Sequence, residues 1–590
     1  MSTVAALALL AGAGVAVASA PYTFYAGPTE VTLPSGASGD GALYAVACTG
    51  LGDCVAAGGY NDGNGDQQAM LETQSGGTWG QASEFTELPT NAAGDPGASL
   101  DGISCTQPGD CAVTGDYNDG AAAVFLDNET AGAFATSSQL EPPSPSLSNG
   151  TIQAEGVSCA GVGDCVAVGN YEQSSAVDQG MIAVESGGDW PTDATEAQLP
   201  ATTTASELFG VSCPGATTCE AVGDYLPSAG GSLPLIETYS AGQWQASTFS
   251  LPSDATSTGQ DSRLNAVSCP SEGSCVAVGS YLDRSGDLAP LIAVLSGATW
   301  QAVSVALPSG AKTGPSSATL NAVSCPTLGS CFAGGSFGDN DYDSLPMIVL
   351  QDGGGWAATQ PSLAGGYFGG STDPVYGVDC ASVGVCAAVG SYYTPSVEAF
   401  VFNALPPLSI TTTSLPPAVV GEPYSAQVGA VGGSGRYTWI MDGGGPLPEG
   451  LTLNAATGVI SGTPTSAANF NFALYVSDPG PPFLSATGDE SIDVTAPPMA
   501  PGVVLTHASA NKRRHSATFK FTASGTSTGF ECGLVKVEKA RHRVVAQPHY
   551  KPCASPKIYH HLRGRFTFYV VAVGLDGRSP TPAVDTFTIG

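Results

Sequence analysis

The stretch LNAVSCPSEGSCVAVGSY occupies residues 264–281, and close variants of it occur seven times in the chain. Each variant has a short apolar run, a cysteine, five residues, a second cysteine and a second apolar run that ends in Gly-x-Tyr or Gly-x-Phe. Self-similarity at a fixed spacing indicates an array of one supersecondary unit. The spacing is 54 to 57 residues, since the first cysteines are Cys48, Cys105, Cys159, Cys213, Cys269, Cys325 and Cys380.

The fifth copy predicts four antiparallel strands, because short apolar runs bounded by Gly, Ser, Pro and Asp are typical of strands. The runs 264–269, 275–281 and 290–296 would be the first three strands, and the fourth would begin at Trp300. Four such strands in each of seven copies are typical of a β-propeller. We therefore predict an all-β chain with a seven-bladed β-propeller over residues 21–405.

The ends of the repeat array predict how the propeller closes. The seventh copy supplies VYGVDC, CAAVGSYY and EAFVFNA but lacks a fourth strand. The N-terminal TEVTLPSG (29–36) is similar to SVALPSG (304–310), which is an outer strand of the fifth copy. We expect residues 29–36 to supply the missing strand, which would remove free sheet edges.

The sixteen cysteines predict eight disulfides and an oxidising compartment. Zinc is the alternative, but the repeats contain no histidine and the spacing is wider than zinc sites use. A short cross-linked loop in every copy would stabilise the fold. The expected pairs are Cys48–Cys54, Cys105–Cys111, Cys159–Cys165, Cys213–Cys219, Cys269–Cys275, Cys325–Cys331, Cys380–Cys386 and Cys532–Cys553.

The N-terminus predicts export. Residues 1–20 resemble a signal peptide, with the apolar run VAALALLAGAGVAV (4–17) before Ala18-Ser19-Ala20. No Lys or Arg precedes the run. This leaves open an uncleaved segment that would be the only attachment to a membrane. We expect a secreted or cell-surface protein.

Charge is divided between the two parts of the chain. Residues 1–500 hold 4 basic and 47 acidic side chains, whereas residues 501–590 hold 13 basic and 4 acidic ones. The acidic part should repel nucleic acid, so we expect no nucleic-acid partner. The basic C-terminal part could bind an anionic cell wall. Oligomeric state cannot be read from these patterns.

Two acidic loops are candidate Ca²⁺ sites, because alternating oxygen side chains in a tight loop suit this ion. The alternative is a solvated acidic turn. The candidate ligands are Asp62, Asn64 and Asp66 in one loop and Asp339, Asp341 and Asp343 in the other.

An aromatic residue ends the second strand of every copy. A ring of such side chains could stack on sugars, or it could pack between neighbouring blades. The candidate ligand-binding residues are Tyr60, Tyr117, Tyr171, Tyr225, Tyr281 and Tyr392, with Phe337 at the same position in the sixth copy.

The turn before the fourth strand, SGATW (296–300) and its copies, resembles the Asp-box hairpin of sialidase-like propellers, although most copies lack the defining Asp. That resemblance implies a structural role. Sialidase activity would need an arginine cluster, and residues 21–405 hold only Arg263 and Arg284. The same residues lack histidine, the commonest general base. Paired carboxylates for glycoside hydrolysis stay open because acids are plentiful.

Two further modules follow a Pro/Thr-rich linker at 406–414. Residues 415–496 contain GEPY (421–424), LPEGL (447–451) and GVISGTP (458–464), and they closely resemble the Ig-like, cadherin-like module of bacterial surface proteins. This resemblance implies a β-sandwich, and cadherin-like folds are associated with Ca²⁺. Residues 503–590 resemble a second Ig-like module, with basic character and a bridge between Cys532 and Cys553.

These patterns predict an exported, non-catalytic surface-binding or adhesion protein for glycans or cell-wall polymers. The variable loops between second and third strands lie opposite the cysteine hairpins, so we expect them to form the binding face. Two alternatives are a secreted, glycosidase-like carbohydrate-active enzyme with an acidic site on the propeller, and a structural surface-layer or stalk protein.

Overall fold

Every regular element in the described part of the chain is a β-strand, as the sequence predicts. The computed structural model describes residues 23–24 and 29–590, except for 95, 145, 148–149, 175–176, 201–202, 229, 257–260, 298, 313–316, 341–342, 353–354, 362–373, 394–395, 406, 434, 479–483, 498 and 538–546. The signal-peptide-like segment 1–20 and the candidate ligand Asp341 lie outside these residues. No helix in the described residues is long and apolar enough to cross a membrane.

The fifth copy of the repeat forms one antiparallel sheet in sequence order, which we call sheet 5. Its strands are β21 (Arg263–Ser271), β22 (Ser274–Leu282), β23 (Leu288–Ser296) and β24 (Thr299–Ser304). Each strand lies within a few residues of the predicted one. The alternation of apolar and small residues thus predicts the strands of this unit correctly.

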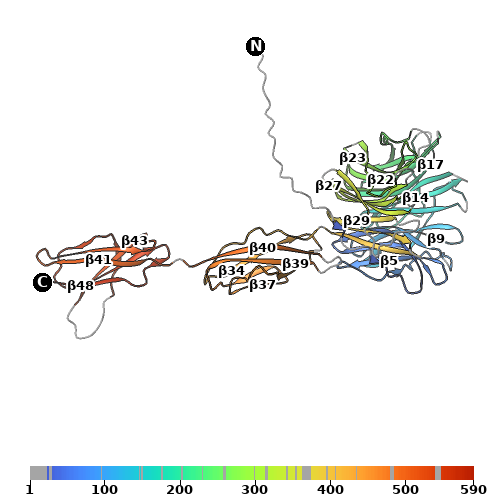
Figure 1. Ribbon diagram of the computed structural model, residues 1–590. Helices are drawn as coiled ribbons and strands as arrows, with labels where there is room; N and C mark the ends of the chain where they lie inside the picture. The colour runs from blue at the N-terminus through green and yellow to red at the C-terminus, as the bar shows by residue number, and fades with distance from the viewer. Residues whose placement is uncertain are drawn as a thin grey trace, which may run out of the picture. The chain divides into compact units, whose positions relative to one another are not determined.

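The other copies form sheets with the same path, which we number by copy. Figure 1 shows several of their strands gathered together, among them β5, β9, β14, β17 and β22. Sheet 1 holds β3 (Ala37–Gly50), β4 (Asp53–Asp62), β5 (Gln67–Ser75), β6 (Thr78–Trp79) and β7 (Ser83–Glu84); sheet 2 holds β8 (Ser99–Gln107), β9 (Asp110–Asn118), β10 (Ala122–Thr130), β11 (Ala133–Phe134) and β12 (Ser138–Leu140); sheet 3 holds β13 (Ile152–Gly161), β14 (Asp164–Ser174), β15 (Val177–Val184) and β16 (Thr195–Glu196); sheet 4 holds β17 (Thr203–Gly215), β18 (Thr218–Pro227), β19 (Leu233–Ser240) and β20 (Gln243–Ser247); sheet 6 holds β25 (Ala318–Thr327), β26 (Ser330–Gly338), β27 (Ser344–Asp352) and β28 (Gly355–Thr359).

Sheet 7 combines both ends of the repeat array. It holds β29 (Val375–Ser382), β30 (Val385–Tyr393) and β31 (Val397–Leu405), and the N-terminal strands β1 (Thr23–Phe24) and β2 (Thr29–Glu30) pair antiparallel with β31. Of the segment 29–36 predicted to supply the outer strand of the seventh copy, Thr29 and Glu30 pair with Val401 and Phe400 of β31.

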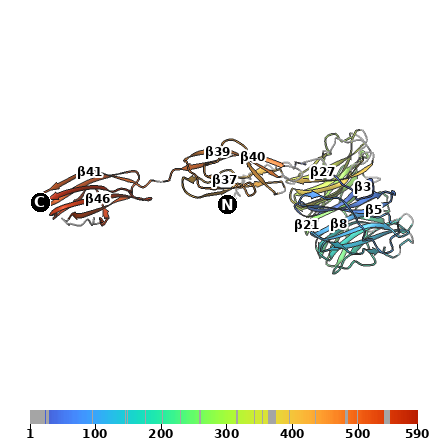
Figure 2. The ribbon, with the colours of Figure 1, turned by 90° about the horizontal axis from the view of Figure 1, so that it is seen from below.

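The first strands of the sheets lie side by side in sequence order. Strand β3 contacts β8, and the series continues through β13, β17, β21, β25 and β29, while β29 also contacts β3. Figure 2 labels three of these first strands, β3, β8 and β21, within the group of sheets. Hydrophobic cores fill the spaces between neighbouring sheets; Val278 and Ile292 of sheet 5, for example, pack with Leu320 and Met347 of sheet 6.

A repeated hydrogen bond links neighbouring first strands. The backbone N–H of a first cysteine donates to the side-chain oxygen of the residue that precedes the first cysteine in the preceding sheet. The pairs are Cys159 to Ser104 (3.1 Å), Cys213 to Ser158 (3.0 Å), Cys269 to Ser212 (3.0 Å), Cys325 to Ser268 (2.9 Å), Cys380 to Ser324 (3.1 Å) and Cys48 to Asp379 (2.7 Å).

Asp379 is the acidic member of this series. Its second carboxylate oxygen accepts a hydrogen bond from the Ser324 hydroxyl at 2.8 Å. Burial raises the pKa of Asp379, while the Cys48 N–H and the Ser324 hydroxyl oppose the rise. One side chain thus joins sheets 6, 7 and 1.

Ala47 occupies the same position in sheet 1 and has no oxygen to accept a hydrogen bond. We predict that Ala47→Ser adds the missing bond to sheet 2 and stabilises the protein by about 1 kcal/mol. Differential scanning calorimetry measures the effect. Ser212→Ala is the matched control and should cost a similar amount. A serine that leaves the transition unchanged, while Ser212→Ala lowers it, would contradict this account of the junction.

A glycine four residues after each second cysteine allows the first two strands of a sheet to approach. A Cβ atom on Gly223 would lie 1.9 Å from the backbone oxygen of Glu207. At the equivalent glycines in the other sheets, a Cβ atom would lie 2.0 to 2.2 Å from a backbone oxygen of the first strand. No residue with a side chain fits there, which explains the repeated Val-Gly-x-Tyr pattern. The other glycines of this position are Gly58, Gly115, Gly169, Gly279, Gly335 and Gly390.

All sixteen cysteines are paired, in the eight disulfides that the sequence predicts. The seven hairpin disulfides join the first two strands of a sheet across their connecting turn. Cys48 and Cys54, for instance, are register partners with Cα atoms 4.0 Å apart.

Residues 406–495 form an Ig-like domain with strands in two main sheets. One holds β33 (Ala418–Val419), β36 (Thr438–Met441), β39 (Ala468–Asp478) and β40 (Leu484–Thr495); the other holds β34 (Tyr424–Gln427), β37 (Leu451–Leu453) and β38 (Val459–Gly462). Trp439, Ile460 and Leu474 are buried. Within the predicted linker, β32 (Ser409–Ile410) pairs with β35 (Ala430–Val431), so this segment has regular structure.

The C-terminal residues also form two antiparallel sheets. One holds β41 (Gly502–Asn511), β42 (Ser516–Ser524) and β45 (Lys557–Tyr559); the other holds β43 (Gly529–Val537), β44 (Lys551–Cys553), β46 (Gly564–Gly574), β47 (Gly577–Arg578) and β48 (Ala583–Ile589). Phe519, Phe521 and Phe568 form their shared core. Contacts divide the whole chain into two compact units; one contains the seven sheets and the other contains these C-terminal residues.

Candidate functional site

The acidic loops predicted to bind Ca²⁺ are stabilised by hydrogen bonds within the turn. The Asp62 carboxylate accepts bonds from the backbone N–H groups of Asn64 (2.8 Å) and Asp66 (3.0 Å). These bonds lower the pKa of Asp62. Asp339 accepts the same bond from the Asp343 N–H at 3.0 Å. In the described residues no three His, Cys, Asp or Glu side chains are placed to hold a metal ion.

The aromatic residues at the ends of the second strands lie mostly in the core. Tyr60, Tyr117, Tyr171 and Tyr281 are at most 4% exposed. The Tyr117 hydroxyl donates to Asn91 at 3.0 Å, and the Tyr281 hydroxyl donates to Asp254 at 3.1 Å. Tyr225 and Tyr392 are half-buried against neighbouring cores. Of the two alternatives that the sequence leaves open, the burial of four of these rings agrees with packing between sheets, which removes them from solvent.

A β-bulge interrupts the first strand of every sheet, four residues before the first cysteine. The bulged residues reach toward neighbouring first strands. The rings of Tyr44 and Tyr376 are 5.6 Å apart, and the side-chain amide of Asn265 donates to the Leu320 oxygen at 2.7 Å. We call this set the bulge residues: Tyr44, Asp101, Glu155, Phe209, Asn265, Asn321 and Tyr376.

Sheets 2 to 4 bring five carboxylates together near these bulges, and we call them the acidic cluster: Asp101, Asp116, Glu155, Glu207 and Asp224. Burial and the charge of Glu155 raise the pKa of Asp101 to about 7. Burial and the charge of Asp101 raise the pKa of Asp116 to about 8. Burial and the charge of Glu207 raise the pKa of Asp224 to about 7.

Arg263 is the cation of this region. It lowers the pKa values of Glu155, Glu207 and Asp224, although burial still leaves each one raised. Its guanidinium lies 5.4 Å from the centroid of the Phe209 ring. The cluster therefore holds protonated carboxyl groups near neutral pH, which can donate as well as accept hydrogen bonds.

Clefts open at the disulfide ends of three junctions: between sheets 7 and 1, sheets 2 and 3, and sheets 4 and 5. In each, the preceding sheet contributes its third strand and the following sheet contributes its disulfide turn and the glycine turn before its fourth strand. The cavity volumes are about 170 Å³, 90 Å³ and 360 Å³ respectively. The clefts lie at the end of the sheets that carries the disulfides. The variable loops, which the sequence predicts to form the binding face, lie at the opposite end.

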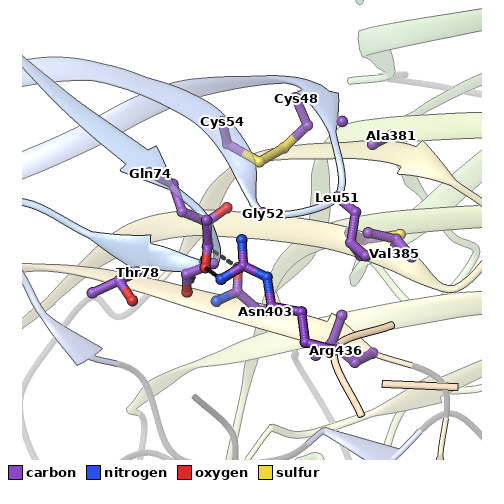
Figure 3. Close-up of a pocket in the computed structure, with 15 residues that line it drawn as sticks. Cys48, Leu51, Gly52, Cys54, Gln74, Thr78, Ala381, Val385, Asn403 and Arg436 are labelled. Atoms are coloured by element: carbon purple, nitrogen blue, oxygen red, sulfur yellow. Dashed lines mark hydrogen bonds between the residues drawn. A yellow bond between two sulfur atoms is a disulfide. The ribbon is translucent and has the colours of Figure 1, made fainter. Parts of the chain in front are cut away.

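A polar pair crosses two of these junctions. Between sheets 7 and 1, the Gln74 amide donates to the Asn403 oxygen at 3.2 Å, as Figure 3 shows. Between sheets 2 and 3, the Asn128 amide donates to the Glu185 carboxylate at 2.6 Å. Burial raises the pKa of Glu185, and this bond opposes the rise.

In the part of the cleft between sheets 4 and 5 that the structure describes there is no such pair, because Leu295 lies where the others have Gln74 and Glu185. Its carboxylate instead comes from Glu220, which is 9% exposed and accepts a hydrogen bond from the Thr238 hydroxyl at 2.7 Å. Burial raises the pKa of Glu220 to about 7, and the Thr238 bond opposes the rise. Tyr239 and Trp300 also line the cleft.

Sequence reasoning missed Glu220, although a signal is present. The residue after the second cysteine is apolar in the six other copies, and only the fourth copy has an acid there. A buried charge in a position that is otherwise apolar is an informative departure. The role of Glu220 depends on Leu295 of the next sheet, and the repeat pattern alone does not show that these two residues line the same cleft.

Residues 406–495 match a family described as "Putative Ig domain". No curated protein matches the chain.

Among solved structures, the chain is similar to a protein of unknown function from Dyadobacter fermentans, with 9% identity over 65% of this chain and 100% of that chain and a TM-score of 0.35. AofleA from Arthrobotrys oligospora has 12% identity over 62% of this chain and 84% of that chain, with a TM-score of 0.29. A "putative alpha-galactosidase" from Bacteroides fragilis has 22% identity, but the match covers 16% of this chain and 19% of that chain, with a TM-score of 0.13. Similarities this low carry no argument about fold or function.

Proposed function

We propose that this chain is an exported, non-catalytic binding protein of the cell surface, in which a seven-bladed β-propeller binds glycans or cell-wall polymers. The cyclic contacts of the first strands support closure of the seven sheets into a propeller, since β29 contacts β3. The Cys48–Asp379 hydrogen bond at the same junction adds to this support. The paired cysteines agree with an oxidising, extracellular location.

The observation that carries the binding function is the repetition of a cleft at equivalent junctions with different linings. A repeated scaffold presents several sites at fixed spacing, which suits a polymer with repeating units because linked binding events reinforce each other. The cleft between sheets 4 and 5 adds the half-buried aromatic side chains Tyr239 and Trp300 to its acceptor groups, and these are the kinds of group that hold sugars. The variable loops at the other end form a second surface on the same scaffold.

The Ig-like domain and the C-terminal domain would serve as spacers or as a second attachment. The C-terminal residues 501–590 carry 13 basic and 4 acidic side chains. Such a surface favours an anionic polymer of the cell wall. The chain would then connect a glycan at the propeller to the cell wall at its other end.

A glycan array and pull-down with insoluble cell walls test this function on the intact chain. We expect saturable binding to a limited set of glycans, with no release of product. Parallel samples with Ca²⁺ and with EDTA test the acidic loops. Absence of binding to every glycan and wall polymer would favour the structural surface-layer or stalk alternative.

The acidic cluster favours a second candidate, a glycosidase-like enzyme. Glycoside hydrolysis uses one protonated and one ionised carboxyl group. The raised pKa of Asp101 (about 7), together with the neighbouring Glu155, would supply such a pair. Release of reducing sugar from a glycan panel, lost in Asp101→Asn and in Glu155→Gln, would establish this activity. Absence of release would leave binding as the function.

A further inference from the structure

The three inter-sheet clefts differ in what fills them. In the clefts between sheets 7 and 1 and between sheets 2 and 3, a side chain from each sheet meets across the junction in a hydrogen bond. These pairs satisfy their own polar atoms and occupy space. The cleft between sheets 4 and 5 lacks the crossing pair, and its volume of about 360 Å³ is the largest of the three.

The register shows why the pair is missing. Leu295 follows Val294, the register partner of Val276, just as Gln74 follows Thr73, the register partner of Val55. Leu295 therefore occupies the place of Gln74, and a leucine side chain cannot form a hydrogen bond across the junction. Thr238 lies opposite Glu220, as Asn403 lies opposite Ala387 in sheet 7. The hydroxyl of Thr238 is used within sheet 4 by Glu220. Glu220 lines the cleft, and its carboxylate can accept hydrogen bonds beyond this one.

Glu220 should lower the stability of the folded protein relative to a valine at the same position. The same position holds Val55, Val166 and Val276 in sheets 1, 3 and 5. Burying a carboxylate in place of valine destabilises a protein unless the charge is fully paired. The Thr238 hydroxyl pairs with only one oxygen of this carboxylate, and a departure from a structural pattern at a residue that also lines a cleft is expected at a functional site.

The rest of the lining suits a sugar. Trp300 and Tyr239 are half-buried and offer apolar ring surface, on which the C–H face of a sugar ring can pack. Gln245 and Glu272 are exposed at the cleft and add polar groups. Among the described residues, the lining has two carboxylates and no basic side chain. This charge repels acidic sugars and attracts hydroxyl or ammonium donors.

We propose that the cleft between sheets 4 and 5 binds one unit of a non-acidic sugar, whose hydroxyl or amino group donates to the Glu220 carboxylate while its ring packs on Trp300 or Tyr239. This inference rests on the proposed glycan-binding function and names the site and the class of sugar. The two clefts with crossing pairs would then be weaker sites for further units of the same polymer.

Titration calorimetry on the intact chain tests the proposal with three probes: neutral chito-oligosaccharides, cationic glucosamine oligomers and anionic oligogalacturonates. We expect binding of a neutral or cationic probe and none of the anionic one. Glu220→Val restores the residue found in three other sheets and should fold well. It should weaken binding at least about tenfold, because a charge-assisted hydrogen bond is lost.

Two further variants make the test specific. Leu295→Gln would recreate the crossing side chain and should also weaken binding, by at least about fivefold, because its amide can donate to the Glu220 carboxylate that the sugar would otherwise use. Glu237→Val is the matched control: it removes a buried carboxylate from the same sheet that does not line the cleft. It should bind as the parent does.

The outcomes separate the two levels of inference. If the parent binds a non-acidic probe and Glu220→Val binds it equally well, the cleft assignment is wrong and the glycan-binding function stands. Preference for the anionic probe also overturns the cleft assignment. If the parent binds none of the three probes and no glycan on the array, both inferences fail together.

Discussion

Reduction of the disulfides should lower the melting temperature of the seven-sheet part by roughly 15 °C. Each hairpin disulfide closes a loop of two cysteines and five intervening residues, which is worth about 2 kcal/mol in the chain-entropy account. Seven of them together contribute on the order of 10 kcal/mol. Calorimetric scans with and without a phosphine reductant, with thiols counted after each scan, measure the loss.

The eighth disulfide provides the control for this result. Cys532 and Cys553 join strands of the C-terminal sheets, which belong to the other compact unit. The double variant Cys532→Ser/Cys553→Ser should change only the transition of that unit. Full reduction of all sixteen cysteines without a shift in the seven-sheet transition would show that the hairpin bonds do not stabilise the fold.

Raising the pH from 5 to 8 should destabilise the same part of the protein and lower its melting temperature by at least about 5 °C. The cause is a set of buried carboxyl groups with raised pKa values. Burial is the main factor for each: the pKa is about 7 for Glu72, Asp101, Asp127, Glu220 and Asp224 and about 8 for Asp116 and Glu237.

The direction follows from proton linkage. Unfolded carboxyl groups have pKa values near 4. Between about pH 4 and pH 8 the folded protein therefore binds more protons than the unfolded chain, and the free energy of unfolding decreases as pH rises. Stability should be greatest below about pH 5 for these groups and should fall until they are ionised. Melting curves at several pH values test the slope, and a rise in stability toward pH 8 would contradict it.

A substitution of Glu237 tests directly how a buried carboxyl group makes stability depend on pH. It is fully buried, and neither carboxylate oxygen has a well-formed hydrogen bond in the described residues, although the Gln198 amide opposes the rise in its pKa. Ala293 and Val349 occupy the same place in sheets 5 and 6. Glu237→Val should stabilise the protein by about 2 kcal/mol at pH 8 and by less at pH 5.

Local patterns predicted much of the architecture. The strands of sheet 5 fall within a few residues of their predicted places, because apolar periodicity and turn residues act within one repeat. The cysteine pairs follow for the same reason, since both partners flank one hairpin turn. The N-terminal strand of sheet 7 could also be predicted, because residues 29–36 resemble the outer strands they replace.

Features that depend on two repeats could not be predicted. The six tyrosines at the ends of the second strands look the same in sequence whether they face solvent or the next sheet, and four of them are buried while Tyr225 and Tyr392 are half-buried. Glu220 stands out within its own repeat, yet its role depends on Leu295 of the following repeat, which the register places at the junction. The carboxylates of the acidic cluster likewise come from three successive sheets.

Equilibrium binding of the intact chain to a glycan array, followed by titration with the Glu220→Val variant, tests the central claim most directly. The account predicts saturable binding of a non-acidic glycan, no hydrolysis during the measurement, and at least about a tenfold loss of affinity in the variant. Hydrolysis of the glycan, or the absence of binding to any glycan, would contradict it.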